Sequence, residues 1–82
     1  MQVELVAPDA ILFSGEADAV LCRTTDGEIA FLDNHAPFLG SLVEGDVTIR
    51  STAGDQTIHS TGGFVEVKNN KVTILSDSAE LT

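Results

Sequence analysis

The sequence predicts an all-β domain, a flattened β-sandwich or barrel of about nine to ten short antiparallel strands. Apolar and polar residues alternate cleanly in the second half of the chain, and a period of two is typical of a strand with one buried face. Gly, Pro, Asn and Asp punctuate the chain between these runs. No stretch carries the sustained 3.6-residue spacing of an amphipathic helix. We therefore expect strands to account for the whole chain.

Length and composition indicate one small domain over residues 1–82. A chain of 82 residues buries about 60% of its unfolded surface and is too short for two independent cores. It is 43% hydrophobic and 21% charged, which is typical of a folded, soluble domain. Apolar runs stay well below the roughly 18 residues of a membrane-spanning helix, and the N-terminus has no secretory pattern. We expect folding in a reducing compartment and no direct membrane insertion.

The chain is strongly acidic, with 13 acidic and 4 basic residues and a net charge of −9. Phosphate binding needs clustered cations, whereas the cations here are scattered along the chain. Nucleic acid and anionic lipid are therefore disfavoured as partners. The acidity either maintains solubility or matches a basic protein surface, and the sequence leaves both open. The four cations are Arg23, Arg50, Lys68 and Lys71.

The first half of the chain contains five expected strands and one clear hairpin. Pro8-Asp9 stops the first run, and Gly15 allows a bend after the second. Asp26-Gly27 is a strong two-residue hairpin signal, so the runs on either side of it should pair antiparallel. Gly40 interrupts the fifth run, which often marks a bulge or a close backbone approach. The expected strands are residues 3–6, 11–14, 18–24, 28–32 and 38–43.

The second half adds two more hairpins. A turn at residues 52–55 separates the alternating run around Val47 from a run that ends at Ser60. Asn69-Asn70 forms the next turn, between runs rich in Val and Ile. Gly62-Gly63 is the most permissive backbone in the chain, and we expect a bend there at an edge of the sandwich. The expected strands are residues 47–50, 57–60, 64–68, 72–75 and a last short one at 78–82.

The segment Asp33-Asn34-His35-Ala36-Pro37 is the strongest candidate for a functional loop. Asp and Asn side chains bond their own backbone in turns, and Pro37 fixes its φ angle, so a rigid loop is expected. The loop displays a carboxylate, an amide and one of only two histidines between two apolar runs. Loops held in this way commonly carry function.

The sequence predicts no catalytic, metal-binding or cofactor-binding residue. His35 and His59 do not form an H-x-H or H-x-x-x-H pattern, and no serine lies in a G-x-S-x-G context. Gly62-Gly63 precedes a strand, whereas phosphate-binding loops open a helix. His59 alternates with Ile58, so we expect its side chain to face solvent. Cys22 is the only cysteine, which excludes an internal disulfide, and we expect a buried, inert thiol.

A prosthetic-group carrier is a different class of acidic, all-β domain of similar length. In lipoyl and biotinyl domains the modified lysine sits on a hairpin tip, and Lys71 lies beside the turn at Asn69-Asn70. The acidic or methionine neighbours that those families place around their lysine are missing here. This alternative is therefore disfavoured.

Several short segments together match the pattern of a known family. They are Val3-Glu4-Leu5-Val6-Ala7-Pro8, Phe13-Ser14-Gly15, Gly27-Glu28-Ile29, His35-Ala36-Pro37-Phe38-Leu39, Gly62-Gly63-Phe64-Val65-Glu66-Val67 and Val72-Thr73-Ile74-Leu75. In order and spacing the chain resembles the N-terminal β-sandwich of the ε subunit of F-type ATP synthase, which is the δ subunit in mitochondria. The resemblance departs at Ala30, where the family usually has glycine, and at Asp33-Asn34, which replace a usual Pro-Gly pair.

The resemblance implies a non-catalytic rotor subunit of the central stalk, without a cofactor. Such a subunit binds the γ subunit and the polar loops of the c ring, and supports the coupling of proton translocation to ATP synthesis. It implies a peripheral position on the cytoplasmic face of the bacterial plasma membrane, which is favoured over an organellar membrane. The positions that match Glu28 and His35 lie near the c ring and γ in the family, and Asp33 and Asn34 are included with them as partner-binding residues.

Two further expectations concern the extent of the domain and its oligomeric state. The family normally continues with two C-terminal helices, whereas we expect no C-terminal helical domain in this chain. We also expect the isolated domain to be monomeric. The alternative function is a free-standing acidic β-sandwich that binds some other protein through the same loop.

Overall fold

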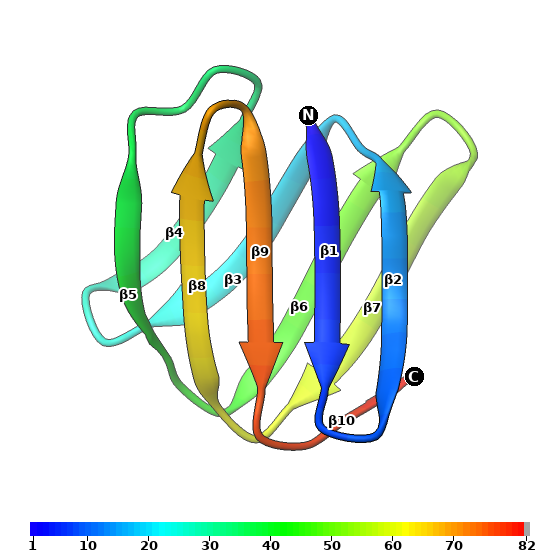
Figure 1. Ribbon diagram of the computed structural model, residues 1–82, viewed down its shortest axis with the longest axis vertical. Helices are drawn as coiled ribbons and strands as arrows, with labels where there is room; N and C mark the ends of the chain where they lie inside the picture. Colours follow the sequence, from blue (N-terminus) through cyan, green and yellow to red (C-terminus); the bar gives the residue numbers. More distant parts are fainter. Residues whose placement is uncertain (82) are drawn as a thin grey trace.

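The computed structural model describes residues 1–81, and within that range it contains strands and no helix (Figure 1). The all-β prediction is confirmed, and every expected run forms a strand. The predicted end of the last strand, Thr82, lies outside the described residues. Over residues 1–81 no helix is long and apolar enough to cross a membrane. The strands are β1 (Gln2–Ala7), β2 (Ala10–Glu16), β3 (Ala19–Thr24), β4 (Gly27–Leu32), β5 (Phe38–Leu42), β6 (Gly45–Ser51), β7 (Gly54–Ser60), β8 (Gly63–Lys68), β9 (Lys71–Ser76) and β10 (Ala79–Leu81).

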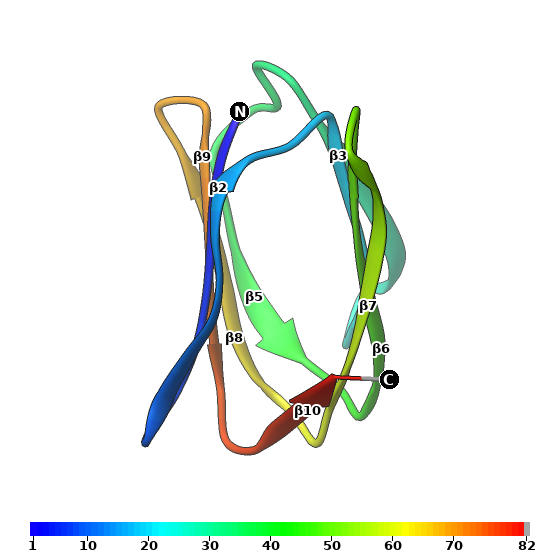
Figure 2. The same ribbon diagram turned by 90° about the vertical axis from the view of Figure 1, so that its right-hand side faces the viewer.

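The strands form two layers packed face to face, which Figure 2 shows edge-on. Along the hydrogen-bonded path the strand order is β10-β7-β6-β3-β5-β8-β9-β1-β2, and β4 pairs with β3 off this path. One layer contains β4, β3, β6 and β7, and the other contains β5, β8, β9, β1 and β2 (Figures 1 and 2). The layers are joined where Thr24 at the end of β3 pairs with Leu42 of β5. The predicted flattened sandwich is therefore confirmed.

One pairing corrects the expectation that all strands are antiparallel. β1 lies between β2 and β9, and it runs parallel to β9, with Val3 opposite Val72 and Leu5 opposite Ile74. A two-residue turn forces its two strands to be antiparallel, but a long connection can return the chain to either end of a strand. Almost the whole domain separates β1 from β9 in sequence, so no local signal fixed their relative direction.

The hydrophobic core lies between the layers and is built from alternate residues of each strand. Val3 and Leu5 of β1 are fully buried, whereas their neighbours along the strand are only partly buried. Phe31 is the largest fully buried side chain, and its ring centroid lies 5.4 Å from that of Phe38. Cys22 is buried as expected, and desolvation raises the pKa of its thiol to about 11. The other fully buried apolar residues are Val20, Val47, Ile49, Ile58, Val65, Val72 and Ile74.

The hairpins follow the local turn signals, with one shift of position. β3 and β4 pair antiparallel as predicted, but the turn residues are Thr25 and Asp26 rather than Asp26 and Gly27. The Thr24 hydroxyl accepts the Asp26 N–H over 3.1 Å and donates to the Gly27 carbonyl over 3.0 Å, which fixes this register. The predicted turn between β8 and β9 is confirmed.

The predicted bend at Gly62-Gly63 is also confirmed, and it carries the chain from β7 in one layer to β8 in the other. A Cβ atom on Gly63 would overlap the carbonyl oxygen of Leu75, so the close approach of β8 and β9 requires glycine at this position. The φ angle of Gly63 is 143°, in a region that other residues rarely adopt.

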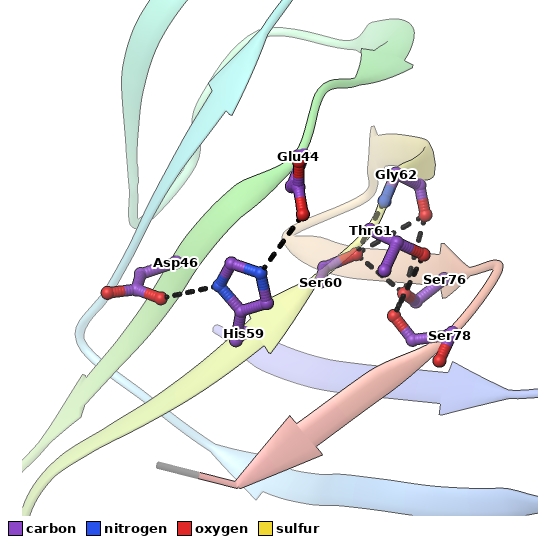
Figure 3. A network of polar contacts seen from close by, with 8 residues as sticks. All are labelled: Glu44, Asp46, His59, Ser60, Thr61, Gly62, Ser76 and Ser78. Atoms are coloured by element: carbon purple, nitrogen blue, oxygen red, sulfur yellow. Dashed lines mark hydrogen bonds and ion pairs between the residues drawn. The ribbon is translucent and has the colours of Figure 1, made fainter.

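Buried hydroxyl groups complete this corner of the sandwich (Figure 3). The Gly62 N–H donates to Ser60 Oγ over 3.1 Å, and the hydroxyls of Ser60 and Ser76 lie 2.6 Å apart. Ser76 Oγ in turn donates to the Ser78 carbonyl over 2.9 Å. Ser60 and Ser76 are both buried, so these bonds supply partners that water cannot reach.

Candidate partner-binding surfaces

The loop between β4 and β5 is held in place by the hairpin between β8 and β9. Asn34 has a φ angle of 62°, and its backbone N–H donates to Oδ1 of Asn70 over 2.8 Å. Asn69 and Asn70 have φ angles of 53° and 59°, which is typical of a tight hairpin turn. The Asn70 carbonyl also accepts the Gln2 N–H over 3.1 Å, so this turn links the loop to the start of β1.

His35 is half-buried and fixed by three contacts. Its backbone N–H donates to the Leu32 carbonyl over 3.1 Å, and its ring meets Phe31 edge to face with centroids 5.0 Å apart. Nδ1 lies 2.7 Å from the Ala36 carbonyl, which can only accept, so the hydrogen is on Nδ1. In the neutral ring Nε2 is then a hydrogen-bond acceptor.

Asp33 is the charged member of the loop. Its carboxylate accepts a hydrogen bond of 2.6 Å from the ammonium group of Met1, which also lies 3.4 Å from a carboxylate oxygen of Glu16. The hydrogen bond with Asp33 is the main reason that the pKa of the Met1 ammonium is raised. The side chain of Asp33 remains 58% exposed and can meet a partner.

Glu28 does not belong to the same surface as the loop. It lies near the start of β4, whereas Asp33, Asn34 and His35 follow the end of that strand. At about 3.3 Å per residue, roughly 16 Å of strand separates Glu28 from Asp33. Glu28 instead accepts a hydrogen bond of 2.8 Å from Arg23, with both side chains largely exposed. The structure therefore brings three of the four predicted residues together and leaves the fourth at the other end of β4.

His59 lies between two carboxylates that the sequence analysis did not identify (Figure 3). Its Nδ1 is 3.1 Å from Asp46 and its Nε2 is 3.5 Å from Glu44. Glu80 of β10 is its cross-strand neighbour on the other side. The hydrogen bonds to Asp46 and then Glu44 raise the pKa of His59. The ring is on the outer face, as predicted, but both of its nitrogens are in contact with carboxylates.

The same outer face contains a groove of about 700 Å³. β3 pairs with β6 only from Ala19 to Leu21, and the strands separate beyond that point. The pairing of Asp46 with His59 follows from the register of the β6–β7 hairpin, which could have been counted outward from the turn at residues 52–53. Residues that line the groove include Leu21, Glu28, Ala30, Asp46, Thr48 and His59.

A row of apolar side chains crosses the outer face of the other layer. Phe64 of β8 lies opposite Leu75 of β9, Leu75 lies opposite Val6 of β1, and Val6 lies opposite Ile11 of β2. Phe64, Leu75 and Ile11 are 57%, 54% and 67% exposed. Contiguous exposed apolar surface on a small domain is typical of a protein contact. The row was missed because its members are adjacent only through the long-range β1–β9 pairing.

Residues 1–82 match the family described as the beta-sandwich domain of the ATP synthase Delta/Epsilon chain. The chain belongs to this family. The match covers residues 1–82, so the strands and the surfaces described above lie within the family's domain.

Curated relatives within this ATP synthase Delta/Epsilon family include three bacterial proteins named ATP synthase epsilon chain. The protein of Corynebacterium efficiens is 51% identical over 94% of this chain, and that of Corynebacterium urealyticum is 50% identical over 93%. The protein of Streptomyces avermitilis is 44% identical over 99% of this chain. The chain spans 63% to 66% of the length of these three relatives.

Two solved structures have the same fold. A chain in the cryo-EM structure of the Euglena gracilis mitochondrial ATP synthase, which contains OSCP, F1 and the c-ring, superposes with a TM-score of 0.88 at 24% identity. A chain in the structure of the Tetrahymena thermophila mitochondrial ATP synthase central stalk and c-ring superposes with a TM-score of 0.80 at 24% identity. Each match covers 96% of this chain, and 51% and 64% of the respective solved chains.

The surfaces of this Delta/Epsilon domain offer charged, polar and apolar side chains. Among residues 1–81 no group of three or more His, Cys, Asp or Glu side chains is placed to hold a metal ion. The side chains on the surfaces described above form ion pairs, hydrogen bonds and apolar patches. Such surfaces can bind and orient other proteins.

Proposed function

We propose that this chain is a non-catalytic central-stalk subunit of an F-type ATP synthase, which links the γ subunit to the c ring. Membership of the Delta/Epsilon family and the epsilon-chain names of relatives at 44% to 51% identity support this proposal. In this role the subunit works from the cytoplasmic face of the bacterial plasma membrane and supports the coupling of proton translocation to ATP synthesis.

The observation that carries the proposal is the exposed apolar row formed by Val6, Ile11, Phe64 and Leu75. The domain has a net charge of −9, yet this row carries no charge across four strands. Charged surface residues maintain solubility, so an exposed apolar row must have another role. Stable protein interfaces have apolar centres with polar rims, and Glu4 and Glu66 border this row on β1 and β8. We assign this face to the γ subunit.

The loop at the end of β4 suits a different kind of partner. It presents Asp33, Asn34 and His35 as hydrogen-bonding groups on a backbone that is fixed by hydrogen bonds to Asn70 and Leu32. A preformed polar loop loses little conformational entropy on binding, so it can contact the polar loops of the c ring. Glu28 contributes separately, from the opposite end of the strand.

The test is co-purification of the chain with γ and the c ring after a single change on the apolar row. Phe64→Asp places a charge in the proposed dry contact, and we expect it to abolish retention of γ. Because Phe64 is 57% exposed, the variant should fold normally. Lys68→Asp, on the same strand but outside the row, is the matched control and should leave assembly intact.

Retention of γ by the Phe64→Asp variant would refute the assignment of this face. If the unmodified chain retains neither γ nor the c ring, the stalk function itself is wrong. The free-standing interaction module is then the better description.

A further inference from the structure

The strand β4 has a side on which no other strand pairs, which we call the free edge of β4. Within the described chain β3 is the only sheet neighbour of β4, and their pairing is continuous from Ala19–Leu32 to Thr24–Gly27. In Figure 1, β4 is the last strand of its layer, behind β5. An unpaired edge presents a row of backbone donors and acceptors to any strand that approaches it.

The backbone groups at this edge can be identified from the hydrogen bonds on the far side of β3. The Arg23 carbonyl accepts the N–H of Val43, so Arg23 directs its backbone groups away from β4. In an antiparallel ladder, facing pairs that exchange backbone hydrogen bonds alternate with facing pairs whose backbone groups both point away from each other. Glu28, opposite Arg23, therefore points its backbone to the free edge, as do Ala30 and Leu32.

Some of these groups already have partners and some do not. The Leu32 carbonyl accepts the N–H of His35. That leaves the N–H groups of Glu28, Ala30 and Leu32 and the carbonyls of Glu28 and Ala30 directed outward. Donors and acceptors of this kind recur at every second residue, which is the pattern that an added strand requires.

The other ends of the sheet carry the protections that natural edge strands use. β2 has an irregular register opposite Leu5 and Val6, and β10 is only 3 residues long. β5 begins directly after Pro37 and its end is paired with β3. By contrast, β4 is a regular strand of 6 residues, and its sequence contains neither proline nor lysine.

The charges around the free edge determine what can bind there. Exposed carboxylates lie at both ends of β4, from Asp26 and Glu28 at its start and Asp33 after its end. Two cations already pair with them, Arg23 with Glu28 and the Met1 ammonium with Asp33, so the three carboxylates still outnumber the cations. A second copy of this chain would bring like charges together on a domain with a net charge of −9.

We propose that the free edge of β4 binds an extended, basic segment of a partner protein by strand addition. The segment forms an antiparallel or parallel ladder with Glu28, Ala30 and Leu32, and its lysine or arginine side chains meet the carboxylates at the two ends of β4. The proposal does not use the apolar row assigned to γ. It shares Glu28 and Asp33 with the contacts proposed for the c ring, so the test below is carried out on the isolated chain.

The experiment is an NMR titration of the ¹⁵N-labelled chain at low ionic strength. The probe is an end-blocked heptapeptide that alternates lysine and valine. We expect the amides of Glu28, Ala30 and Leu32 to shift and to become protected from hydrogen exchange. The amides of Ile29 and Phe31, which already face β3, should change little.

Two matched controls separate strand addition from simple charge attraction. A heptapeptide with the same charges but N-methylated at alternate backbone positions should bind at least about tenfold more weakly, because it cannot complete the ladder. In the chain itself, Ala30→Pro removes an outward N–H and should weaken binding similarly, whereas Ala30→Ser keeps that N–H and should not. The N-methylated probe needs no change to the protein, so the test stands even if Ala30→Pro does not fold.

Three results would overturn the proposal. The first is equal binding of the two lysine peptides, which means that charge alone is responsible. The second is the absence of protection at Glu28, Ala30 and Leu32 when the peptide is in excess. The third is a concentration-dependent dimer that protects the same amides without peptide, which would make a second copy the occupant. None of these results depends on whether γ or the c ring co-purifies with the chain.

Discussion

The hydroxyl chain at the Gly62 corner allows a sharp prediction about stability. Ser60→Ala removes the acceptor of the Gly62 N–H, and Gly62 is buried, so this donor is left without a partner. A buried unsatisfied group costs about 1–3 kcal/mol, and we expect Ser60→Ala to lower the free energy of unfolding by about 2 kcal/mol.

Ser76→Ala should lower the free energy of unfolding by less, although both variants remove the 2.6 Å contact between the two hydroxyls. Without Ser76 Oγ, the Ser60 hydroxyl can turn to the Gly62 carbonyl, which lies 3.3 Å away. Only the Ser78 carbonyl then loses a donor, and carbonyls tolerate this better than N–H groups do. We therefore expect a loss of about 1 kcal/mol, and a double variant that costs less than the sum of the two single changes.

The measurement is urea unfolding followed by far-ultraviolet circular dichroism, because the chain contains no Trp or Tyr for fluorescence. With a slope of about 1 kcal/mol per molar urea, the midpoints should fall by about 2 M and 1 M. Ser78→Ala is the control, since Ser78 accepts through its backbone carbonyl, and its midpoint should hardly move. A larger loss for Ser76→Ala than for Ser60→Ala would refute the reasoning.

Three further predictions follow from the geometry. Gly63→Ala should lower the free energy of unfolding by more than about 3 kcal/mol, because its methyl group would overlap the backbone carbonyl of Leu75. The control is Gly54→Ala, where φ is 120° but the space is open, and we expect a loss of about 1 kcal/mol in the same urea assay. Hydrogen bonds to Asp46 and Glu44 raise the pKa of His59 in the folded state. The contribution of His59 to the free energy of unfolding is therefore complete below the unfolded pKa of about 6.5 and is lost as the pH rises through the folded pKa. His59→Gln should consequently flatten the pH dependence of the urea midpoint between about pH 5.5 and 8.5. Glu28→Ala should change stability by less than about 0.5 kcal/mol, whereas His35→Ala should cost about 1 kcal/mol through its ring contact; equal melting temperatures for the two variants would contradict this difference.

The sequence by itself determined the elements whose signals are local. Alternation of apolar and polar residues placed the strands, and Asn69-Asn70 and Gly62-Gly63 marked a turn and a bend because few other residues adopt those backbone angles. The burial of Cys22 was visible from its apolar neighbours. The motif pattern of the whole chain also identified the family, which the match over residues 1–82 confirms.

The predicted site was recovered only in part, and its role in partner binding stays a prediction. Asp33, Asn34 and His35 are consecutive, so their grouping required no knowledge of the fold. That Glu28 is remote from them depends on β4 being fully extended. That Asn34 is fixed by Asn70 depends on two turns that come together in space.

Only the tertiary structure decided how segments distant in sequence are arranged. The parallel pairing of β1 with β9 places Val6 beside Leu75 and so creates the apolar row. The pairing of β4 with β3 alone leaves β4 with an unpaired edge. Neither arrangement can be predicted from a short stretch of residues, because a long connection permits either strand direction and any of several neighbouring strands. The choice is made by burial of the shared core, in which Val3, Leu5, Val72 and Ile74 exclude water together only when these two strands lie side by side.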